Sequence, residues 1–495
     1  MSAAENTVTR TWSPYQTAIF SFVETGTGNA VIEAVAGSGK TTTIVEAVRR
    51  SGGDHIFLAF NKSIAGELQS RGVNAKTFHG LCYAPLASYT GGKLNADKLR
   101  DILFAAIESG GLSAVEAQAY GTFAKKLVGL ARQAGGGCLV ADEEHVWSDI
   151  VEHHDLSDDL GDNCSVARGI AIARRLLEVS NEMADFDFDD MLYRVVKDGV
   201  RLTHFDFVYV DEAQDTNAIQ RAILRKIMHG GSRLVAVGDP AQAIYGFRGA
   251  DSSSLGLIAS EFSCVRLPLT VSYRCPQAVV RHAQKWVSHI EAAPSAPEGE
   301  VTSLMSWKAD TFNPGDMVVC RTTAPLISLA YALLKAKRPV KVMGREIAQG
   351  LVGLVNRMQA AGIPRLVEKL EAWGDRETQR AIAKGNEARA AAVADQVESL
   401  LSLIAGLGEN EKTVPGLIRL IESLFAEVKN AVVLATIHKS KGLEARRVFW
   451  LDSHKCPSKW ARKDWQIEQE LNLMYVATTR AIDSLILIDS EGRSF

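Results

Sequence analysis

A glycine-rich segment near the N-terminus has the composition of a phosphate-binding loop. In 34-AVAGSGKTT-42, an apolar run precedes two glycines, a lysine and a threonine. Glycines let the backbone turn its N–H groups around a phosphate, Lys40 can reach the β- and γ-phosphates, and the Thr41 hydroxyl can ligate Mg²⁺. The sequence therefore predicts a site for ATP and Mg²⁺; a chance turn is the alternative, and Ala34 replaces the first consensus glycine. The predicted nucleotide contacts are Ala36, Gly37, Ser38, Gly39, Lys40, Thr41 and Thr42.

A pair of carboxylates follows another apolar run, in 207-FVYVDEAQDT-216. Parallel α/β sheets bind ligands at the carboxyl ends of their strands. Asp211 is therefore expected to hold Mg²⁺, and Glu212 to orient and deprotonate the attacking water. Acidic pairs also cap turns between strands and helices, but the neighbouring phosphate loop favours the catalytic interpretation.

A third apolar run leads into 237-VGDPAQAIYGFRGA-250. Gln242, just beyond the predicted strand, is a candidate sensor of the γ-phosphate. Tyr245, Phe247 and Arg248 offer two aromatic faces and a cation, which suits base stacking and phosphate contact on a single strand. Core packing is the alternative for the two aromatic residues.

Short runs rich in β-branched residues predict the strands that position these motifs. They indicate two parallel α/β sheets, which join near residues 265–280. The stretches 80–180 and 346–428 have helical periodicity and predict helical insertions, and 292–300 is the best candidate for a linker. The predicted strands are 30–36, 55–60, 207–210 and 234–239 in the first half, and 317–320, 340–343, 431–436, 448–451 and 484–488 in the second.

Composition excludes several classes of protein. Among 495 residues, 55 Lys and Arg stand against 58 Asp and Glu, so any polyanion must bind a local patch rather than an overall basic surface. The seven cysteines lack the spacing of a zinc site, which favours a reducing, cytosol-like compartment. We expect no membrane span and no secretory signal, because no sufficiently long apolar run occurs.

Several further strings resemble superfamily 1 DNA helicases of the UvrD/Rep/PcrA type. The strings 59-AFNKSIA-65, 77-TFHGL-81 and 471-LNLMYVATTRA-481 are most similar to the helicase core of F-box DNA helicases. The resemblance implies an α/β protein with two RecA-like parallel-sheet domains, one bearing the phosphate loop, and helical insertions in both. The implied divisions are 1–80 and 181–268 for the first RecA-like domain, 81–180 for its insertion, 269–345 and 430–495 for the second, and 346–429 for its insertion.

The resemblance also assigns nucleotide contacts outside the phosphate loop. Gln16, in 12-WSPYQ-16, corresponds to a residue that reads adenine, and Tyr273 to a ring that stacks on it. Glu444 is assigned to the ribose. Arg274 and Arg480 are assigned to the γ-phosphate, a task that suits the planar, permanently charged guanidinium. These arginines would read the γ-phosphate from the second sheet, so that hydrolysis opens and closes the protein on DNA.

Contacts with DNA are implied for two groups of residues. In this family the aromatic of the first string stands at the position of Ala59, one place before Phe60, and a tryptophan is common where this chain has Phe247. Asn472 replaces a usual arginine, so no role is assigned to it. The implied DNA contacts are Phe60, Asn61, Thr77, His79, His438 and Lys441, beside Tyr245, Phe247 and Arg248.

The function implied is an ATP-dependent DNA helicase that moves 3′ to 5′ on single-stranded DNA. Single strands and forked duplexes would be its substrates, replication or recombination proteins its partners, and a bacterial or phage-encoded origin fits. A translocase that strips bound proteins is the alternative; a scaffold without hydrolysis is disfavoured because the catalytic residues are intact. The segment 455–465 mixes basic residues with Trp460 and Trp465. It is either a nucleic-acid contact or a solvated loop that its tryptophans anchor.

Overall fold

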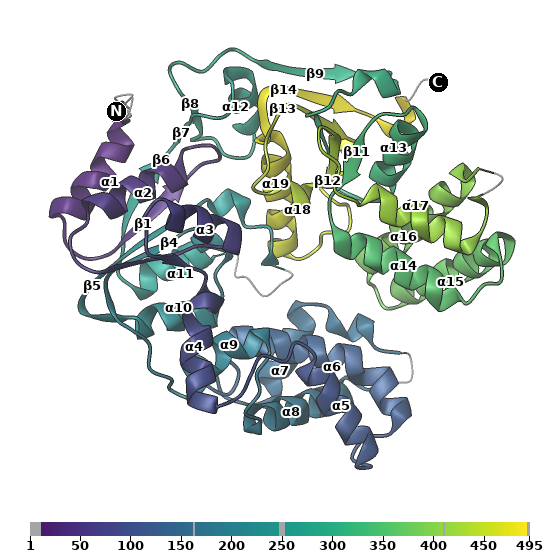
Figure 1. Cartoon of the computed structure of the whole chain (residues 1–495), viewed down its shortest axis with the longest axis horizontal. Helices are drawn as coiled ribbons and strands as arrows, with labels where there is room; N and C mark the ends of the chain where they lie inside the picture. The colour runs from purple at the N-terminus through teal and green to yellow at the C-terminus, as the bar shows by residue number, and fades with distance from the viewer. Residues whose placement is uncertain (1–10, 162–163, 247–252, 409–410, 493–495) are drawn as a thin grey trace, which may run out of the picture. The chain divides into compact units, whose positions relative to one another are not determined.

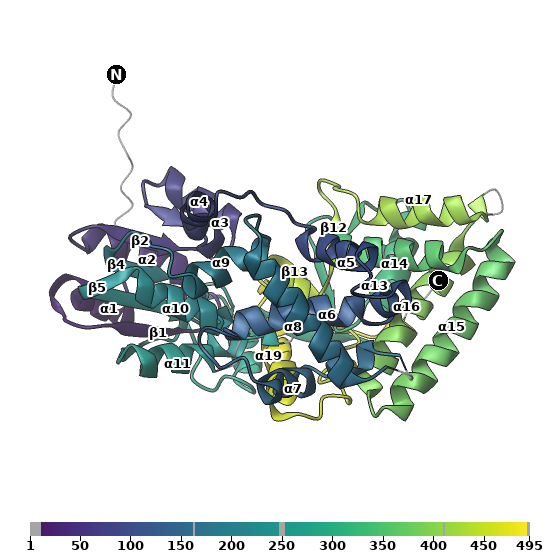
Figure 2. The same ribbon diagram turned by 90° about the horizontal axis from the view of Figure 1, so that it is seen from below.

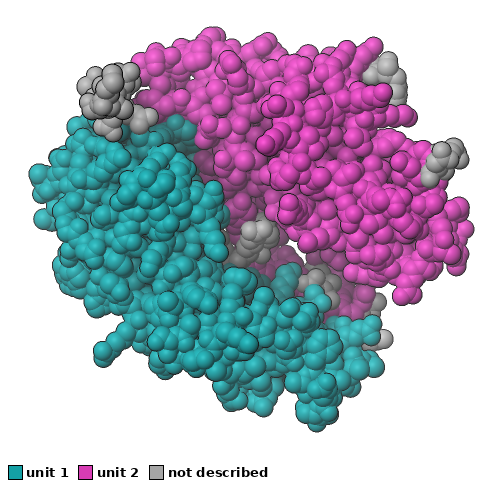
Figure 3. Space-filling view, in the orientation of Figure 1, with its two compact units in different colours: residues 1–150, 164–240, 248–270 teal, residues 151–163, 241–247, 271–495 magenta. Residues whose placement is uncertain are grey.

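The computed structural model describes residues 11–161, 164–246, 253–408 and 411–492. The chain forms two compact units, each assembled from separate segments (Figure 3). Each unit contains one six-stranded sheet (Figure 1). Unit 1 consists of Met1–Ile150, Cys164–Pro240 and Arg248–Thr270, and unit 2 of Val151–Asn163, Ala241–Phe247 and Val271–Phe495.

The sheet of unit 1 is parallel, with the order β3-β2-β4-β5-β1-β6. The four strands expected in this half of the chain are confirmed. The two edge strands were not predicted, because β3 has only two residues and β6 is largely exposed and contains Pro268, a residue that edges tolerate. The strands are β1 (Ala30–Ala34), β2 (His55–Leu58), β3 (Ala75–Lys76), β4 (Phe205–Val210), β5 (Met228–Gly238) and β6 (Val265–Leu269).

Helices of unit 1 fall into two groups. One group accompanies the sheet: α1 (Pro14–Thr25), α2 (Lys40–Arg50), α3 (Lys62–Ser70), α10 (Ala218–Lys226) and α11 (Ser254–Glu261). The other group lies in the predicted insertion and just after it, and its helix α6 packs on α5, α8 and α9. This group consists of α4 (Phe78–Thr90), α5 (Lys98–Glu108), α6 (Ala114–Ala134), α7 (Glu144–His153, which continues into unit 2), α8 (Val166–Glu182) and α9 (Phe188–Lys197).

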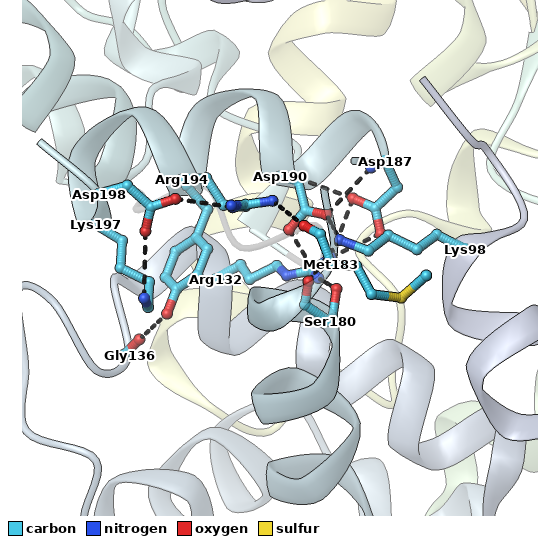
Figure 4. Close-up of polar contacts among 11 residues, drawn as sticks. Lys98, Arg132, Gly136, Ser180, Met183, Asp187, Asp190, Arg194, Lys197 and Asp198 are labelled. Atoms are coloured by element: carbon cyan, nitrogen blue, oxygen red, sulfur yellow. Dashed lines mark hydrogen bonds and ion pairs between the residues drawn. The ribbon is translucent and has the colours of Figure 1, made fainter. Parts of the chain in front are cut away.

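A buried ion cluster ties four of these helices together (Figure 4). Lys98 Nζ on α5 lies 2.6 Å from Asp190 Oδ2 on α9, and Arg132 Nη2 on α6 lies 2.9 Å from the other carboxylate oxygen. Arg132 also contacts Asp187, 2.8 Å away, and donates to Ser180 Oγ on α8. Buried charges need such partners, so this cluster fixes how the helices pack.

The sheet of unit 2 is also parallel, with the order β11-β12-β10-β13-β14-β9. All five strands expected in this half are confirmed. The linker prediction for 292–300 is wrong: this segment begins at the end of β8 and runs into β9 within unit 2. Its polarity reflects the largely exposed loop between these two strands. The strands are β9 (Glu300–Leu304), β10 (Met317–Cys320), β11 (Val340–Val342), β12 (Val432–Thr436), β13 (Ala445–Leu451) and β14 (Ala481–Ile488), with β7 (Val271–Ser272) paired to β8 (Glu291–Ala292).

The helices of unit 2 include the predicted helical stretch, α14 to α17 (Figures 1 and 2). This stretch shares one hydrophobic core with the sheet. Leu366 and Leu400 from that stretch belong to the same buried cluster as Val318 and Leu434 of the sheet. No helix in the described ranges has the length and hydropathy to cross a bilayer. The helices are α12 (Gln277–Ala283), α13 (Ala324–Lys335), α14 (Arg345–Met358), α15 (Ile363–Ala383), α16 (Glu387–Gly406), α17 (Val414–Leu424), α18 (Ile437–Ser440) and α19 (Asp464–Thr478).

Candidate active site

The predicted phosphate loop connects β1 to α2 in unit 1. Gly37 and Gly39 have φ angles of 70° and 77°, a left-handed conformation that disfavours residues with a Cβ atom. Gly39 is the N-cap of α2 and provides no side-chain cap. The first N–H groups of a helix have no partner within the helix itself, and the helix dipole favours an anion there.

A buried polar atom in the loop also fits a phosphate ligand. Ser38 is fully buried, and its Oγ atom has no hydrogen-bond partner among the described residues. Unpartnered buried hydroxyl groups cost free energy, and a bound oxyanion would relieve that cost. Lys40 adds a cation at the start of α2, and Thr41 and Thr42 follow it, half-buried. These residues suit a nucleotide polyphosphate with Mg²⁺.

The predicted base lies beside the predicted phosphate-binding lysine. Lys40 Nζ is 3.6 Å from Glu212 Oε1. Glu212 has a φ of 50°, which is unusual for a residue other than glycine and is typical of strained functional positions. Its backbone N–H donates to Asp211 Oδ1 at 2.9 Å, so the two carboxylates after β4 are held in a defined geometry.

Gln214 is a residue of this site that the sequence interpretation missed. It is fully buried, and its Nε2 atom donates to Glu212 Oε2. Its Oε1 atom accepts a hydrogen bond of 3.0 Å from the backbone N–H of Asp239, at the end of β5. Gln214 therefore holds the Glu212 carboxylate, the predicted base, against a second strand end. Its place in 207-FVYVDEAQDT-216 was the available signal.

Gln16, the predicted adenine reader, is connected to the phosphate loop. Its Nε2 atom donates to Thr43 Oγ1 at 2.9 Å, and Thr43 Oγ1 donates in turn to the carbonyl of Gly39. Its Oε1 atom accepts from the backbone N–H of Ser13 in a capping box. The structure thus brings Gln16 together with the first turn of α2.

Two of the predicted DNA contacts in unit 1 are helix caps. Asn61 Oδ1 accepts from the backbone N–H of Ile64 and caps α3, and Thr77 Oγ1 accepts from Gly80 and caps α4. Phe60, next to Asn61, is 47% exposed, which suits a stacking role. His79 is half-buried, and burial lowers its pKa.

An exposed aromatic residue beside His79 was also missed. Phe188 is the first residue of α9, is 53% exposed, and lies with its ring centroid 6.5 Å from that of His79. Nothing in the local sequence distinguishes it from a core phenylalanine. Only the tertiary structure brings the two rings together.

In unit 2, Arg480 is almost fully buried and makes several hydrogen bonds. Its guanidinium donates to the carbonyls of Val476 and Leu443 at 2.9 and 3.1 Å, and to Thr479 Oγ1 at 3.1 Å. A longer contact of 3.5 Å reaches Gln242 Oε1. The two residues predicted to read the γ-phosphate, Arg480 and Gln242, are thus brought together in this unit.

Arg274, the other predicted γ-phosphate contact, pairs with a carboxylate. Its Nε atom lies 2.5 Å from Glu444 Oε2, the group predicted to bind ribose. Tyr273 beside it is 48% exposed, as a ring that stacks on a base requires. Arg274, Glu444 and Tyr273 therefore form one partly exposed group.

Residues 242–245 are held within unit 2 by contacts of three side chains. Lys441 Nζ donates to the carbonyl of Gln242 at 2.8 Å and lies 4.9 Å from the centroid of the Tyr245 ring. Tyr245 Oη donates weakly to the carbonyl of His438, at 3.5 Å. Asn472, which received no role from the sequence, donates to the carbonyl of Ala243 at 3.0 Å. The predicted contacts Phe247 and Arg248 lie outside the described residues.

Two families of helicase domains match this chain. Residues 140–263 match the UvrD/REP helicase N-terminal domain, and residues 363–492 match the UvrD-like helicase C-terminal domain. The chain therefore belongs to the UvrD-like, superfamily 1 DNA helicases.

Individual relatives agree with this assignment. F-box DNA helicase protein 1 of Schizosaccharomyces pombe is 26% identical, with 93% of this chain and 55% of the relative aligned. F-box DNA helicase 1 of Gallus gallus is 25% identical over 93% of this chain and 47% of its own length. The ATP-dependent DNA helicase PcrA of Staphylococcus epidermidis is 28% identical over 21% of this chain and 15% of its own. The chain spans about half the length of the F-box relatives.

Proposed function

We propose that this chain is an ATP-dependent DNA helicase that moves 3′ to 5′ on single-stranded DNA. The observation that carries the proposal is the arrangement of Lys40, Glu212 and Gln214 beside an uncapped helix N-terminus. The Lys40 ammonium and the N-terminus of α2 support polyphosphate binding. The Glu212 carboxylate, which the buried Gln214 amide fixes in place, supports activation of water.

Phosphate binding and base activation are coupled in this proposal. The Lys40 ammonium lies 3.6 Å from Glu212 Oε1. A polyphosphate competes for that ammonium, and Glu212 then becomes available to accept the proton of the attacking water. Thr41 and Asp211 would hold Mg²⁺, which would supply neutralisation of the phosphate charge. Arg274 and Arg480 stabilise the charge that develops on the γ-phosphate.

The two units correspond, in this proposal, to the two RecA-like domains with their helical insertions. Unit 1 provides the phosphate loop, the base and the predicted strand contacts from Phe60 to His79. Unit 2 provides the two arginines, the Tyr273 ring and the contacts His438, Lys441 and Tyr245. We propose Phe188 as a further strand contact, because an exposed ring beside His79 can stack on a base.

ATPase and unwinding measurements test the proposal. Hydrolysis should depend on Mg²⁺ and rise when single-stranded DNA is added. A forked or 3′-tailed duplex should be unwound, whereas a duplex with only a 5′ tail should not. Preferential unwinding of the 5′-tailed duplex would contradict the 3′-to-5′ direction. ATPase activity that does not change when DNA is added would contradict the helicase function. Displacement of a recombinase filament without unwinding would favour the protein-stripping translocase instead.

A further inference from the structure

A cavity of about 650 Å³ lies in unit 2, apart from the proposed nucleotide contacts. Its walls include residues that follow three neighbouring parallel strands: Thr322 after β10, His438 after β12 and Lys455 after β13. Carboxyl ends of parallel strands are where α/β sheets bind ligands, and the volume falls in the range of ligand sites. The cavity is therefore built like a binding site.

The basic and aromatic segment 455–465 divides into an anchored part and an accessible part. Lys463 pairs with Asp155 at 2.8 Å, Arg462 pairs with Glu387 at 2.6 Å, and Trp465 stacks on His153 with ring centroids 5.3 Å apart. These contacts hold the end of the segment in place. Trp465, one of the two tryptophans of the segment, is therefore an anchor.

The residues of this segment that line the cavity, Lys455 and Lys459 among them, have different contacts. Lys455 pairs with buried Asp452 at 2.8 Å. Among the described residues, Lys459 makes no ion pair, and its Nζ atom lies 4.4 Å from the centroid of the half-buried Trp460 ring. An exposed cation–π contact is weak, so the ammonium can leave the ring for a phosphate. Lys459 and Trp460 therefore offer a cation and an aromatic face at the cavity.

Small residues of α16 line the opposite part of the cavity. Ala388, Ala391, Ala392 and Asp395 have the spacing of one helix face, and all four line the cavity. Asp395 accepts hydrogen bonds from the backbone N–H groups of Thr323 and Ala324, and so fixes α16 to the start of α13. The alanines leave room that larger side chains would fill.

We propose that this cavity binds one segment of the single-stranded DNA on which the protein moves, with Trp460 stacking on a base and Lys459 contacting a phosphate. The inference rests on the proposed function and adds residues that no helicase string contains. A strand is favoured over a small anion because hydroxyl, imidazole, ammonium and indole groups meet in one cavity. That mixture suits a backbone together with its bases.

Binding of a fluorescent oligo-dT strand to the full chain tests the inference. Trp460→Ala should weaken binding about 5- to 100-fold, and Trp460→Phe should restore part of the loss. Lys459→Ala should lower the slope of log affinity against log salt by about 0.7, the value of one lost phosphate contact on a single strand. Lys335→Ala, at the far end of α13, is the matched control and should leave the slope unchanged.

A substitution that fills the cavity tests whether the strand binds there. Ala392→Phe should weaken strand binding, because the ring occupies the cavity. Ala394→Phe on the same helix should not, since Ala394 lies about 200° further round and does not line the cavity. Both alanines are exposed, so neither change should alter the melting temperature. An oligonucleotide with 5-iodouracil should also crosslink, on irradiation, to the peptide that contains Trp460.

The possible results separate this inference from the proposed function. A wild-type chain that neither binds the strand nor hydrolyses ATP in response to it would overturn both. Normal strand binding in folded Trp460→Ala and Ala392→Phe, with no crosslink near residue 460, would overturn the cavity inference alone. If millimolar dTMP suppresses the crosslink as effectively as unlabelled oligo-dT does, the cavity would be reassigned to a free nucleotide.

Discussion

Lys40 Nζ lies 3.6 Å from Glu212 Oε1, although 172 positions separate the two residues in the chain. One residue begins the helix after β1 and the other follows β4, with β5 between these strands in the sheet. The cation that should bind phosphate and the carboxylate that should activate water are therefore neighbours in the folded chain.

Lys40→Ala should abolish ATP hydrolysis, because it removes the cation that neutralises charge on the transferred phosphate. Turnover measured with saturating DNA is the test. Arg49→Ala is the matched control, since Arg49 lies on the same helix with a side chain 60% exposed. Turnover of Lys40→Ala within a few-fold of wild type would refute the phosphate-loop assignment.

Glu212→Gln should bind ATP and fail to hydrolyse it, because ligation of Mg²⁺ by Asp211 is retained while the base is lost. Equilibrium binding of labelled ATP, compared with single-turnover hydrolysis, separates the two steps. Equal losses of binding and of hydrolysis would argue for a structural role.

Gln214→Ala should lower kcat with little change in KM, since the hydrogen bonds of Gln214 position Glu212. The side chain is buried, so some loss of stability is also expected. Gln214→Glu, a variant of similar shape, places a second carboxyl group beside Glu212. The pH–rate profile of this variant should shift to higher pH, because neighbouring carboxylates raise each other's pKa. An unchanged profile would count against the positioning role.

Arg274→Ala and Arg480→Ala should differ, although the sequence assigns both to the γ-phosphate. Arg274 is partly exposed and pairs with Glu444, so its loss should reduce turnover and leave the melting temperature nearly unchanged. Arg480 is buried and is the donor to the carbonyls of Val476 and Leu443, so its loss should also cost about 1–3 kcal/mol of folding free energy. Thermal unfolding beside DNA-stimulated ATPase measures both. Equal melting temperatures of the two variants would contradict this distinction.

Phe188→Ala should weaken binding of single-stranded DNA by about 1–3 kcal/mol, the usual value of one base stacked on an aromatic ring. Because the ring is exposed, the melting temperature should hardly change. Phe104→Ala on another helix, α5, removes a similarly exposed ring, 57% accessible, and is the control. A similar loss of affinity in both variants would show that the effect is not specific to Phe188.

Several features of the protein follow from local sequence. Apolar, β-branched runs identified nine strands, because a strand buried on both faces must be apolar along its whole length. The glycines at 37 and 39 indicated a tight loop there, since a left-handed backbone restricts which residues can stand at those positions. The phosphate contact of Lys40 stays a prediction. The position of Asp211 and Glu212 followed from the strand that precedes them.

Tertiary structure decided the features that depend on partners distant in the chain. Gln214 connects Glu212 to the end of β5, and Asn472 holds the segment at Ala243; neither bond leaves a local pattern. The segment 455–465 reads as one basic, aromatic stretch, yet its end is fastened by Asp155, Glu387 and His153 while Lys459 and Trp460 line a cavity. A charged or aromatic side chain looks the same in sequence whether it is paired or accessible, because its partners come from other elements.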